Sequence, residues 1–485
     1  MTHYLGVDVG TSSSKAVLTN ETGEIVAQAS RPHSVDRPRA GFVEMDPVEW
    51  WHAFVELTQL LTREGTVPVD AVGVSGMGPC FAPTTESGAP TRAAILYGVD
   101  TRSTTQIQAL TERFGDAEIV RRCGSRLSTQ AVGPKMLWMH DEEPEAFADS
   151  RRFFTTSSWL TWKLTGAYVL DHHSASQCAP LYDLENAEWN SEWSATIAPR
   201  LHLPELRWST ERAGAVTREA SQLTGLPIGT PVTVGTIDAW AEAVSVGADA
   251  PGDLMIMYGT TMFLIAATGT RVVAPPLWST QGVRPASNSL AGGMATSGAV
   301  LEWVRTLVGG ASHTELEHEA QNSGAGASGL LLLPYFAGER TPIDDPRARG
   351  VLAGLTLSHS RGDIYRAALE ATAFGVRHHL RAFADGGARI TRAVAVGGGA
   401  ASALWTQIVS DIAGIEQSIP TITVGASYGS AKLAAELCNV EGTDSWNPEA
   451  RTTRPRVDPN HFEPVFRLYE ELYGATQGIV QALAD

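Results

Sequence analysis

The feature that most constrains the fold is the opening stretch YLGVDVGTSSSKAVLTNETGEIVA, residues 4–27. Its apolar runs predict three antiparallel strands joined by short turns: Tyr4–Val9, Lys15–Leu18 and Ile25–Ser30. Strands disfavour aspartate, yet Asp8 stands inside the first one. A carboxylate followed by a glycine turn with free backbone N–H groups and hydroxyls predicts a site for a metal ion and a phosphate.

A second pattern of strand, turn and strand follows roughly 250 residues later, about the length of a large domain. Leu254–Tyr258 and Met262–Ile265 flank Gly259-Thr260-Thr261, so both predicted hairpins have a Gly-Thr tip. Ala250–Asp253 reads as a turn and predicts a domain boundary just before this hairpin. Two interpretations stay open: an internal duplication that gives two related halves, or chance, because Gly-Thr hairpins are common.

Composition bounds the class of protein. With 485 residues, 43% of them apolar, the chain predicts two or more domains with sizeable cores. A net charge of −17 argues against nucleic acid or an anionic membrane as a partner. The start of the chain lacks the pattern of a signal peptide, and apolar runs such as 329–336 are too short to cross a bilayer, which predicts a cytoplasmic protein. The four cysteines lie far apart in the sequence and form no CxxC pair, and we expect them to be free thiols in a reducing cytoplasm.

A glycine-rich loop follows a predicted strand in the second half. Ala393–Val396 is the strand, Gly397–Gly399 the loop, and Ala400–Gly414 the predicted helix. This order lets the backbone approach a nucleotide closely, although glycine-rich turns also occur for tight packing alone.

Two acidic positions could support phosphoryl transfer if the hairpin tips faced each other across a cleft. Asp8 would then hold Mg²⁺ through water, because Mg²⁺ gives up its water ligands reluctantly. Asp238 ends an apolar strand and precedes an alanine-rich helix. It is a candidate general base for a sugar hydroxyl, but aspartate is also a favoured helix N-cap, and one residue could fill both roles.

Asp100 and Arg102 stand two residues apart. In a strand they would share a face. They could bind a polyhydroxylated ligand or form a simple ion pair, and the residues alone favour the ion pair.

Taken together, these motifs resemble the FGGY family of carbohydrate kinases, and within it the pentulose kinases of the xylulokinase type. The resemblance covers most of the chain, from about residue 4 to about residue 435, with the motifs in the expected order. The motifs that carry it are GVDVGTSSSK (6–15), GFVEMDPVEWW (41–51), PKMLW (134–138), GTIDAWA (235–241), YFAGERTP (335–342), GVLAGLTLSHSRGDIYRAALE (350–370) and GGGAASALWTQIVSDIAG (397–414).

The resemblance implies an α/β fold of two RNase H-like domains of the actin/hexokinase/Hsp70 type, with ATP, Mg²⁺ and sugar in the cleft between them. We expect the domains to span residues 1–247 and 248–485. Asp238 would be the catalytic base and a sugar contact, and Asp8 would act near Mg²⁺. The other implied positions are Gly10, Thr11, Ser12, Ser13, Lys15, Gly259, Thr260 and Thr261 at the phosphates, Gly398 and Gly399 at the adenosine, and Met77, Gly78, Asp100 and Arg102 at the sugar.

Two departures from the family pattern leave the sugar open. The chain has Met77-Gly78 where xylulokinases typically have Met-His, and Gly98-Val99 where they have Trp-Asn. A ketopentose such as D-xylulose is the expected substrate. Ribulose, erythritol, further polyols, glycerol and gluconate are candidates as well, because two altered contacts can redirect a polar pocket.

Two functions of a different class also stay open, an actin-like or Hsp70-like ATPase and a sugar-binding protein without kinase activity. The ATPases share the hairpin chemistry, but the segments around Asp238 and at 350–370 resemble the sugar kinases. By analogy with relatives, a homodimer is possible.

Overall fold

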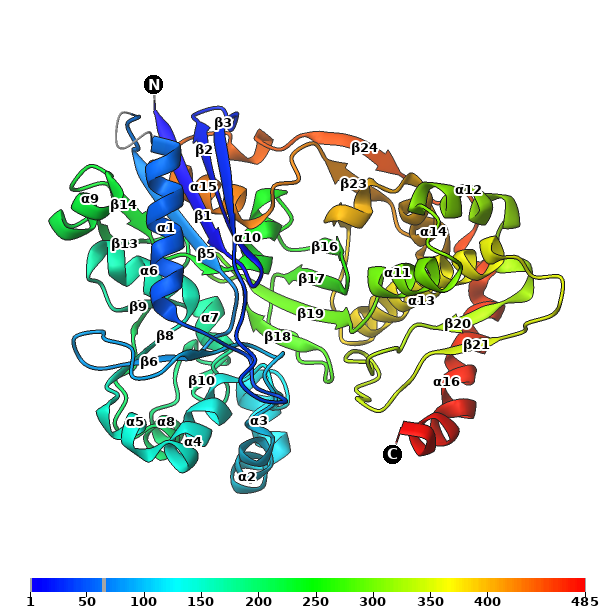
Figure 1. Ribbon diagram of the computed structural model, residues 1–485, viewed down its shortest axis with the longest axis horizontal. Coiled ribbons are helices and arrows are strands. Elements are labelled where there is room, and N and C mark those ends of the chain that lie inside the picture. The colour runs from blue at the N-terminus through cyan, green and yellow to red at the C-terminus, as the bar shows by residue number, and fades with distance from the viewer. Residues whose placement is uncertain (1, 63–66, 485) are drawn as a thin grey trace.

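The structure is a computed structural model that describes residues 2–62 and 67–484. Two seven-stranded sheets organise these residues, one on each side of the molecule in Figure 1. The first sheet has the order β13-β14-β5-β1-β2-β3, with β15 paired to β5. Its strands are β1 (His3–Val9), β2 (Ser13–Asn20), β3 (Ile25–Pro32), β5 (Ala71–Gly76), β13 (Arg212–Ala215), β14 (Pro231–Thr233) and β15 (Thr236–Ile237).

The opening stretch folds as the three antiparallel strands that its sequence predicts. In the β1–β2 hairpin Asp8 lies opposite Lys15, and β1 also pairs in parallel with β5. Helix α1 (Pro47–Thr62) follows this stretch and packs on β2 and β3. Asp46 precedes the helix, and its Oδ1 accepts the N–H of Val48 at 2.9 Å.

The second sheet has the order β18-β19-β17-β16-β22-β23-β24. Its central hairpin, β16–β17, is antiparallel, and β16 pairs in parallel with β22, as β1 does with β5. The same local pattern therefore occurs in both halves, as a duplication predicts. The strands are β16 (Asp253–Tyr258), β17 (Met262–Thr268), β18 (Trp278–Gln281), β19 (Asn288–Met294), β22 (Arg392–Val396), β23 (Gln417–Pro420) and β24 (Glu449–Thr453).

The remaining elements surround the two sheets. In the first half, α2 to α5 and α8 form a lobe below the first sheet in Figure 1. In the second half, α11 to α14 and α16 pack around the outer end of the second sheet, and the chain ends on α16. The first-half elements are β4 (Glu44–Met45), β6 (Ala82–Thr84), β7 (Ala94–Ile95), α2 (Thr104–Phe114), α3 (Asp116–Cys123), α4 (Val132–Glu142), α5 (Pro144–Asp149), β8 (Arg152–Phe154), α6 (Thr156–Thr165), β9 (Val169–Asp171), α7 (His172–Ser176), β10 (Tyr182–Asp183), β11 (Glu188–Trp189), α8 (Ser191–Ile197), β12 (Glu205–Arg207), α9 (Arg218–Thr224) and α10 (Asp238–Ser245). The second-half elements are α11 (Gly298–Leu307), α12 (His313–Ser323), β20 (Leu331–Leu333), β21 (Val351–Ala353), α13 (Arg361–Asp385), α14 (Ala403–Ala413), α15 (Ala426–Leu437) and α16 (Glu463–Ala484).

Two helices, α10 and α15, pack against each other between the sheets. Helix α15 belongs to the second half of the sequence, yet it covers β1 and β5 of the first sheet. The contact is so close that a Cβ added at Gly6 would lie 2.0 Å from the carbonyl oxygen of Ser427, and one at Gly73 would lie 1.9 Å from that of Ser430. Only glycine fits at these two strand positions, so the sequence of the first sheet is adapted to a helix of the second half.

Within the described residues, no helix is both long enough and apolar enough to cross a membrane. In the sequence, the predicted turn Ala250–Asp253 comes after the last strand of the first sheet, and its final residue, Asp253, is the first residue of β16.

Candidate active site

A cavity of about 500 Å³ lies between the two sheets and is lined by residues from both halves of the chain. Asp8 and Lys15 reach it from the β1–β2 hairpin, and Gly259 and Thr261 reach it from the β16–β17 hairpin. Asp238 lies in the same wall. The two predicted hairpins therefore flank one space that contains both predicted carboxylates.

Asp8 is held at the end of β1 beside β5. The hydroxyl of Ser75 donates to its Oδ1 at 2.8 Å, and no hydrogen bond to Oδ2 is found among the described residues. Burial raises the pKa of Asp8 to about 6, although the Ser75 hydrogen bond and the nearby Lys15 act in the opposite direction. One carboxylate oxygen is thus left for a ligand.

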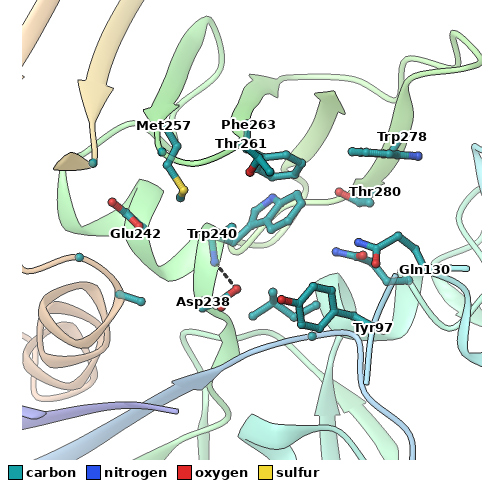
Figure 2. A pocket seen from close by; sticks show the side chains of 18 of the residues that line it. Tyr97, Gln130, Asp238, Trp240, Glu242, Met257, Thr261, Phe263, Trp278 and Thr280 are labelled. Carbon is teal, nitrogen blue, oxygen red and sulfur yellow. Dashed lines mark hydrogen bonds between the residues drawn. The ribbon is translucent and has the colours of Figure 1, made fainter. Parts of the chain in front are cut away.

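Asp238 is the first residue of α10, with Ile237 at the N-cap position. Its Oδ1 accepts the N–H of Ala239 at 2.8 Å, so the side chain stays at the helix terminus instead of capping the next turn (Figure 2). Burial raises the pKa of Asp238 well above its usual range, and the negative charge of Asp8 raises it further. A carboxylate in this setting is a stronger base than a solvated one.

Glu242, one helical turn after Asp238, adds a third carboxylate to the cavity. Burial and the charge of Asp8 raise its pKa to about 7, while Lys15 lowers it. Among the described residues, no three His, Cys, Asp or Glu side chains lie close enough to hold a metal ion directly. Asp8, Asp238 and Glu242 thus give this part of the cavity an acidic lining.

Aromatic side chains line a further part of the same cavity (Figure 2). The rings of Trp240 and Phe263 meet edge to face at 5.9 Å between centroids, and Phe263 stacks with Trp278 at 5.9 Å. Tyr97 comes from the first half, and its hydroxyl lies 2.8 Å from Oγ1 of Thr11. Apolar ring faces next to amide and hydroxyl groups are suited to a polyol, which has both C–H and O–H faces.

Of the residues predicted to contact the sugar, some line the cavity and others lie outside it. Gly78 lines the cavity, whereas Met77 is buried outside the lining. The side chains of Asp100 and Arg102 are fully buried and form an ion pair with 2.7 Å between Nη2 and Oδ2. Arg102 also pairs with Glu44, at 2.6 Å. The ion pair that the residues favoured is confirmed, and neither side chain belongs to the cavity lining.

The segment around Asp100 is irregular and lies just before α2. There Oδ2 of Asp100 accepts the N–H of Val43 at 2.6 Å. Asp100 and Arg102 therefore do not share a strand face, and their ion pair brings the two side chains together instead.

The glycine-rich loop contributes two of its three glycines to the cavity, Gly397 and Gly398. Gly399 packs instead against Trp405, 2.4 Å from where a Cβ would lie. The helix predicted from Ala400 begins later, because a 3₁₀ turn at Gly398–Ala401 precedes α14. The side chain of Ser402 caps α14 by accepting the N–H of Trp405 at 3.1 Å.

The other residues predicted at the phosphates belong to the hairpin tips but not to the cavity lining. In the first tip the N–H of Gly10 donates to the carbonyl of Ser13 at 3.1 Å, and the N–H of His33 donates to the carbonyl of Ser12 at 3.0 Å. In the second tip the carbonyl of Thr260 accepts the N–H of Ser297 at 2.9 Å. Their phosphate contacts stay predictions.

Comparison with known proteins identifies the family. The N-terminal domain of the FGGY family of carbohydrate kinases matches residues 3–245, and the C-terminal domain of that family matches residues 254–437. This chain belongs to the FGGY family of carbohydrate kinases. The fold prediction is confirmed with it, since the two-domain architecture is that of known sugar kinases.

Individual relatives of this FGGY kinase bear different substrate names. The xylulose kinase of Escherichia coli (strain K12) is 29% identical over 443 residues, covering 90% of this chain and 90% of the relative. A glycerol kinase of Beutenbergia cavernae is 32% identical over 501 residues, covering 97% and 96%. The crystal structure of xylulose kinase from Rhodospirillum rubrum, 30% identical, superposes with a TM-score of 0.92 over 99% of both chains.

Several cavity residues of this FGGY kinase were not predicted from the sequence. Glu242 could have been found, because four residues after Asp238 lies on the same helix face. Val424, Gly425 and Ala426, before and at the start of α15, had no such signal. Nor did Trp278, which reaches the cavity only through the order of strands in the second sheet.

Proposed function

We propose that this FGGY kinase transfers the γ-phosphoryl group of ATP to a hydroxyl of a ketopentose such as D-xylulose, with Asp238 as the general base. The observation that supports the proposal most directly is the shared cavity. Asp8 and Asp238 both line it, and the two hairpins contribute Lys15 on one side and Gly259 and Thr261 on the other. Alignment and charge neutralisation are what phosphoryl transfer requires of a protein.

The side chains fit a hydrated Mg²⁺. Asp8 and Asp238 each use one carboxylate oxygen inside the protein, and the other has no partner among the described residues. Asp8 and Asp238 would hold the ion through its water ligands, and bound Mg²⁺ would supply charge neutralisation at the phosphates. Lys15 is exposed and lines the same cavity, where its ammonium group can pair with a phosphate oxygen.

The adenosine would be bound by the backbone of the glycine-rich loop in the second half of the chain. Gly397 and Gly398 would lie against the adenosine, and a Cβ at Gly398 would meet no described atom within 4 Å, which leaves room for a ligand. The proposed domains, residues 1–247 and 248–485, would then each supply one hairpin to the phosphates.

In the chemical step the sugar hydroxyl oxygen attacks the γ-phosphorus, the bond from that phosphorus to the ADP oxygen breaks, and the hydroxyl proton passes to the carboxylate of Asp238. The raised pKa of Asp238 favours this transfer. The walls formed by Trp240 and Phe263 would exclude water, which otherwise competes with the sugar as phosphoryl acceptor.

D-Xylulose is proposed first because two solved structures named for xylulose kinases superpose on the chain with TM-scores of 0.92, although glycerol kinases match the sequence over a similar length. Ribulose, erythritol, glycerol and gluconate are the next candidates, since Gly78 and Gly98 replace larger polar residues of the family pattern. An ATPase of the actin or Hsp70 type is a weaker candidate, since it leaves the aromatic wall without a role. The cytoplasm is the proposed location.

A panel of sugars tests the proposal. The purified chain is given ATP and Mg²⁺ with D-xylulose, D-ribulose, erythritol, glycerol or D-gluconate, and ADP release is followed by a coupled enzyme. We expect one substrate to raise ADP release far above the rate without sugar. Asp238→Asn should lower kcat with that substrate by about 10²–10⁴-fold. Equal release with and without every sugar would contradict the kinase assignment, and an undiminished Asp238→Asn variant would contradict the base.

A further inference from the structure

Arg340 lines the cavity from the second half of the chain, in the segment that follows β20. Its Nη2 donates to the carbonyl of Met294 at 2.8 Å, which ties the side chain to the end of β19. Its guanidinium carbon lies 5.7 Å from the centroid of the Trp278 ring. Arg340 is therefore fixed in the wall that faces Tyr97 and the first half.

The charge of Arg340 is not paired within the part of the chain that the structure describes. No ion pair is found for it there, and neither Nε nor Nη1 has a hydrogen-bond partner among these residues; Nε is buried. The adjacent carboxylate is used elsewhere, since Oε1 of Glu339 accepts the N–H groups of Ala295 and of Arg340 itself, both at 2.8 Å. By contrast, Arg126 at the same cavity pairs with Asp116 at 3.2 Å.

A guanidinium enclosed without an ion pair is costly, because one hydrogen bond to the Met294 carbonyl and the charge of Glu339 replace only part of the hydration that it has lost. Burial lowers the pKa of Arg340, but arginine keeps its proton in proteins. Two further polar atoms in the same wall, Oγ of Ser279 and Oγ1 of Thr280, are also buried without partners among the described residues. In Figure 2 Thr280 lies beside Trp278 and across from Tyr97 and Gln130. A polar ligand would complete this wall.

We propose that Arg340 binds an anionic oxygen of a ligand in the cleft, so that the second half of the chain supplies an anion subsite in addition to its glycine backbone. The inference rests on the proposed kinase function. Two ligand groups could supply this anionic oxygen: the terminal phosphoryl group of the nucleotide or the carboxylate of a sugar acid. Planar donors suit both groups.

Binding measurements test the subsite without turnover. The full chain and its Arg340→Gln variant are titrated calorimetrically with a non-hydrolysable ATP analogue (AMP-PNP) and Mg²⁺, with D-gluconate, and with neutral D-xylulose. Losing a charge-assisted hydrogen bond should weaken one anionic probe by about 10- to 100-fold. D-Xylulose should change less than about threefold. Loss of AMP-PNP binding identifies the phosphoryl oxygen, and loss of D-gluconate binding identifies the carboxylate.

Two further variants separate charge from geometry. Arg126→Gln removes a cation whose charge Asp116 already balances, and we expect a much smaller change than for Arg340→Gln. Arg340→Lys keeps a cation without the planar fork and serves if Arg340→Gln lowers the melting temperature; it should lose binding by an intermediate factor. The proposal is overturned if both Arg340 variants bind both anions within threefold of the parent chain, or if the parent binds neither.

That result is distinct from failure of the kinase assignment, which depends on the sugar panel with the unaltered chain. If the parent chain phosphorylates a sugar and Arg340→Gln binds AMP-PNP and D-gluconate normally, the kinase function is supported and the anion subsite is contradicted. If the parent chain phosphorylates no sugar but substitution of Arg340 abolishes AMP-PNP binding, the anion subsite is supported and the kinase function is contradicted.

Discussion

The two hairpins at the cavity have the same backbone plan and opposite chemistry. In β1–β2 the last pairs before the tip are Val9 with Ser14 and Asp8 with Lys15. In β16–β17 they are Tyr258 with Met262 and Met257 with Phe263. The charged pair Asp8–Lys15 and the apolar pair Met257–Phe263 thus occupy equivalent positions, and all four residues line the cavity.

This difference shows that a repeated fold need not repeat its chemistry. Both tips carry Gly-Thr, but the side chains of the residue pairs before each tip differ in charge and polarity. The first hairpin presents charge, where a metal ion and phosphates are expected. The second joins Trp240 and Trp278 in an apolar wall. A cleft with one charged and one apolar side can hold a ligand that is itself divided in this way.

The largest effect should come from removing the charge of the first hairpin. We expect Asp8→Asn to lower kcat by about 10²–10³-fold, since it removes a preorganised charge from the phosphate end. Folding should be retained, because burial already disfavours the ionised form of Asp8. The measurement is steady-state kinetics over a range of Mg²⁺ concentrations, with thermal unfolding alongside.

Met257→Leu is the matched change at the equivalent position of the second hairpin. It conserves volume and carries no charge, so it should cost less than about 1.5 kcal/mol of stability and change kcat by less than about tenfold. Equal losses of kcat in Asp8→Asn and Met257→Leu would mean that the two hairpins do not differ in task.

A smaller effect should follow from filling the glycine loop that accompanies only the second hairpin. A Cβ at Gly398 would meet no described atom within 4 Å, and the residue does not need a positive φ. Gly398→Leu should therefore fold normally and raise the KM for ATP by about 10-fold or more, because its side chain would occupy the proposed adenosine space. Kinetics at varied ATP together with thermal unfolding check this.

Gly399 is the control next in sequence. A Cβ there would lie 2.4 Å from the Trp405 ring, so Gly399→Leu should cost about 1–3 kcal/mol or more of stability through overpacking. If Gly398→Leu destabilised the fold as much as Gly399→Leu does, the open space at Gly398 would have a structural role instead of a binding role.

The last effect concerns the pH dependence of stability and the buried carboxyl group of Glu339. Burial raises the pKa of Glu339 from 4.5 to about 7, while its backbone hydrogen bonds and Arg340 lower it. The folded chain then holds a proton that the unfolded chain has released. The contribution of Glu339 to stability is therefore full below pH 4.5 and is lost as the pH rises through about 7, by on the order of 3 kcal/mol.

Glu339→Gln should flatten this pH dependence without abolishing it, because the raised pKa values of Asp8 and Glu242 act with the same sign. Urea unfolding at about pH 5, 6, 7 and 8 gives the comparison. A steeper fall for Glu339→Gln than for the parent chain would show that the sign assigned to this group is wrong.

The sequence was sufficient for those parts of the fold that depend on local patterns. The strands of both hairpins and the strand at Ala393–Val396 follow from runs of apolar residues bounded by turn residues. The positions of Asp8 and Asp238 in one cavity could be expected only through the resemblance between motifs. The strand predictions succeeded because each depends on a pattern within a few neighbouring residues.

What could not be predicted depends on contacts between distant residues. Trp278 and Arg340 reach the cavity because β18 and the segment after β20 both lie beside β19. The order of strands in a sheet cannot be inferred from any single stretch of sequence. Asp100 and Arg102 were ambiguous because a carboxylate and a guanidinium serve an ion pair and a sugar site equally well. The half-buried partner Glu44, which lies far from both in the sequence, distinguishes these uses.

The position of α15 has a consequence for synthesis of the chain. One face of the first sheet, around Gly6 and Gly73, is covered by residues that the ribosome adds only near position 437. At about 5–20 residues per second, the nascent first half waits roughly 10–40 s for that helix. During this interval the strands β1 and β5 lack their native cover, so completion of the first sheet is a late event even though its strands are made first.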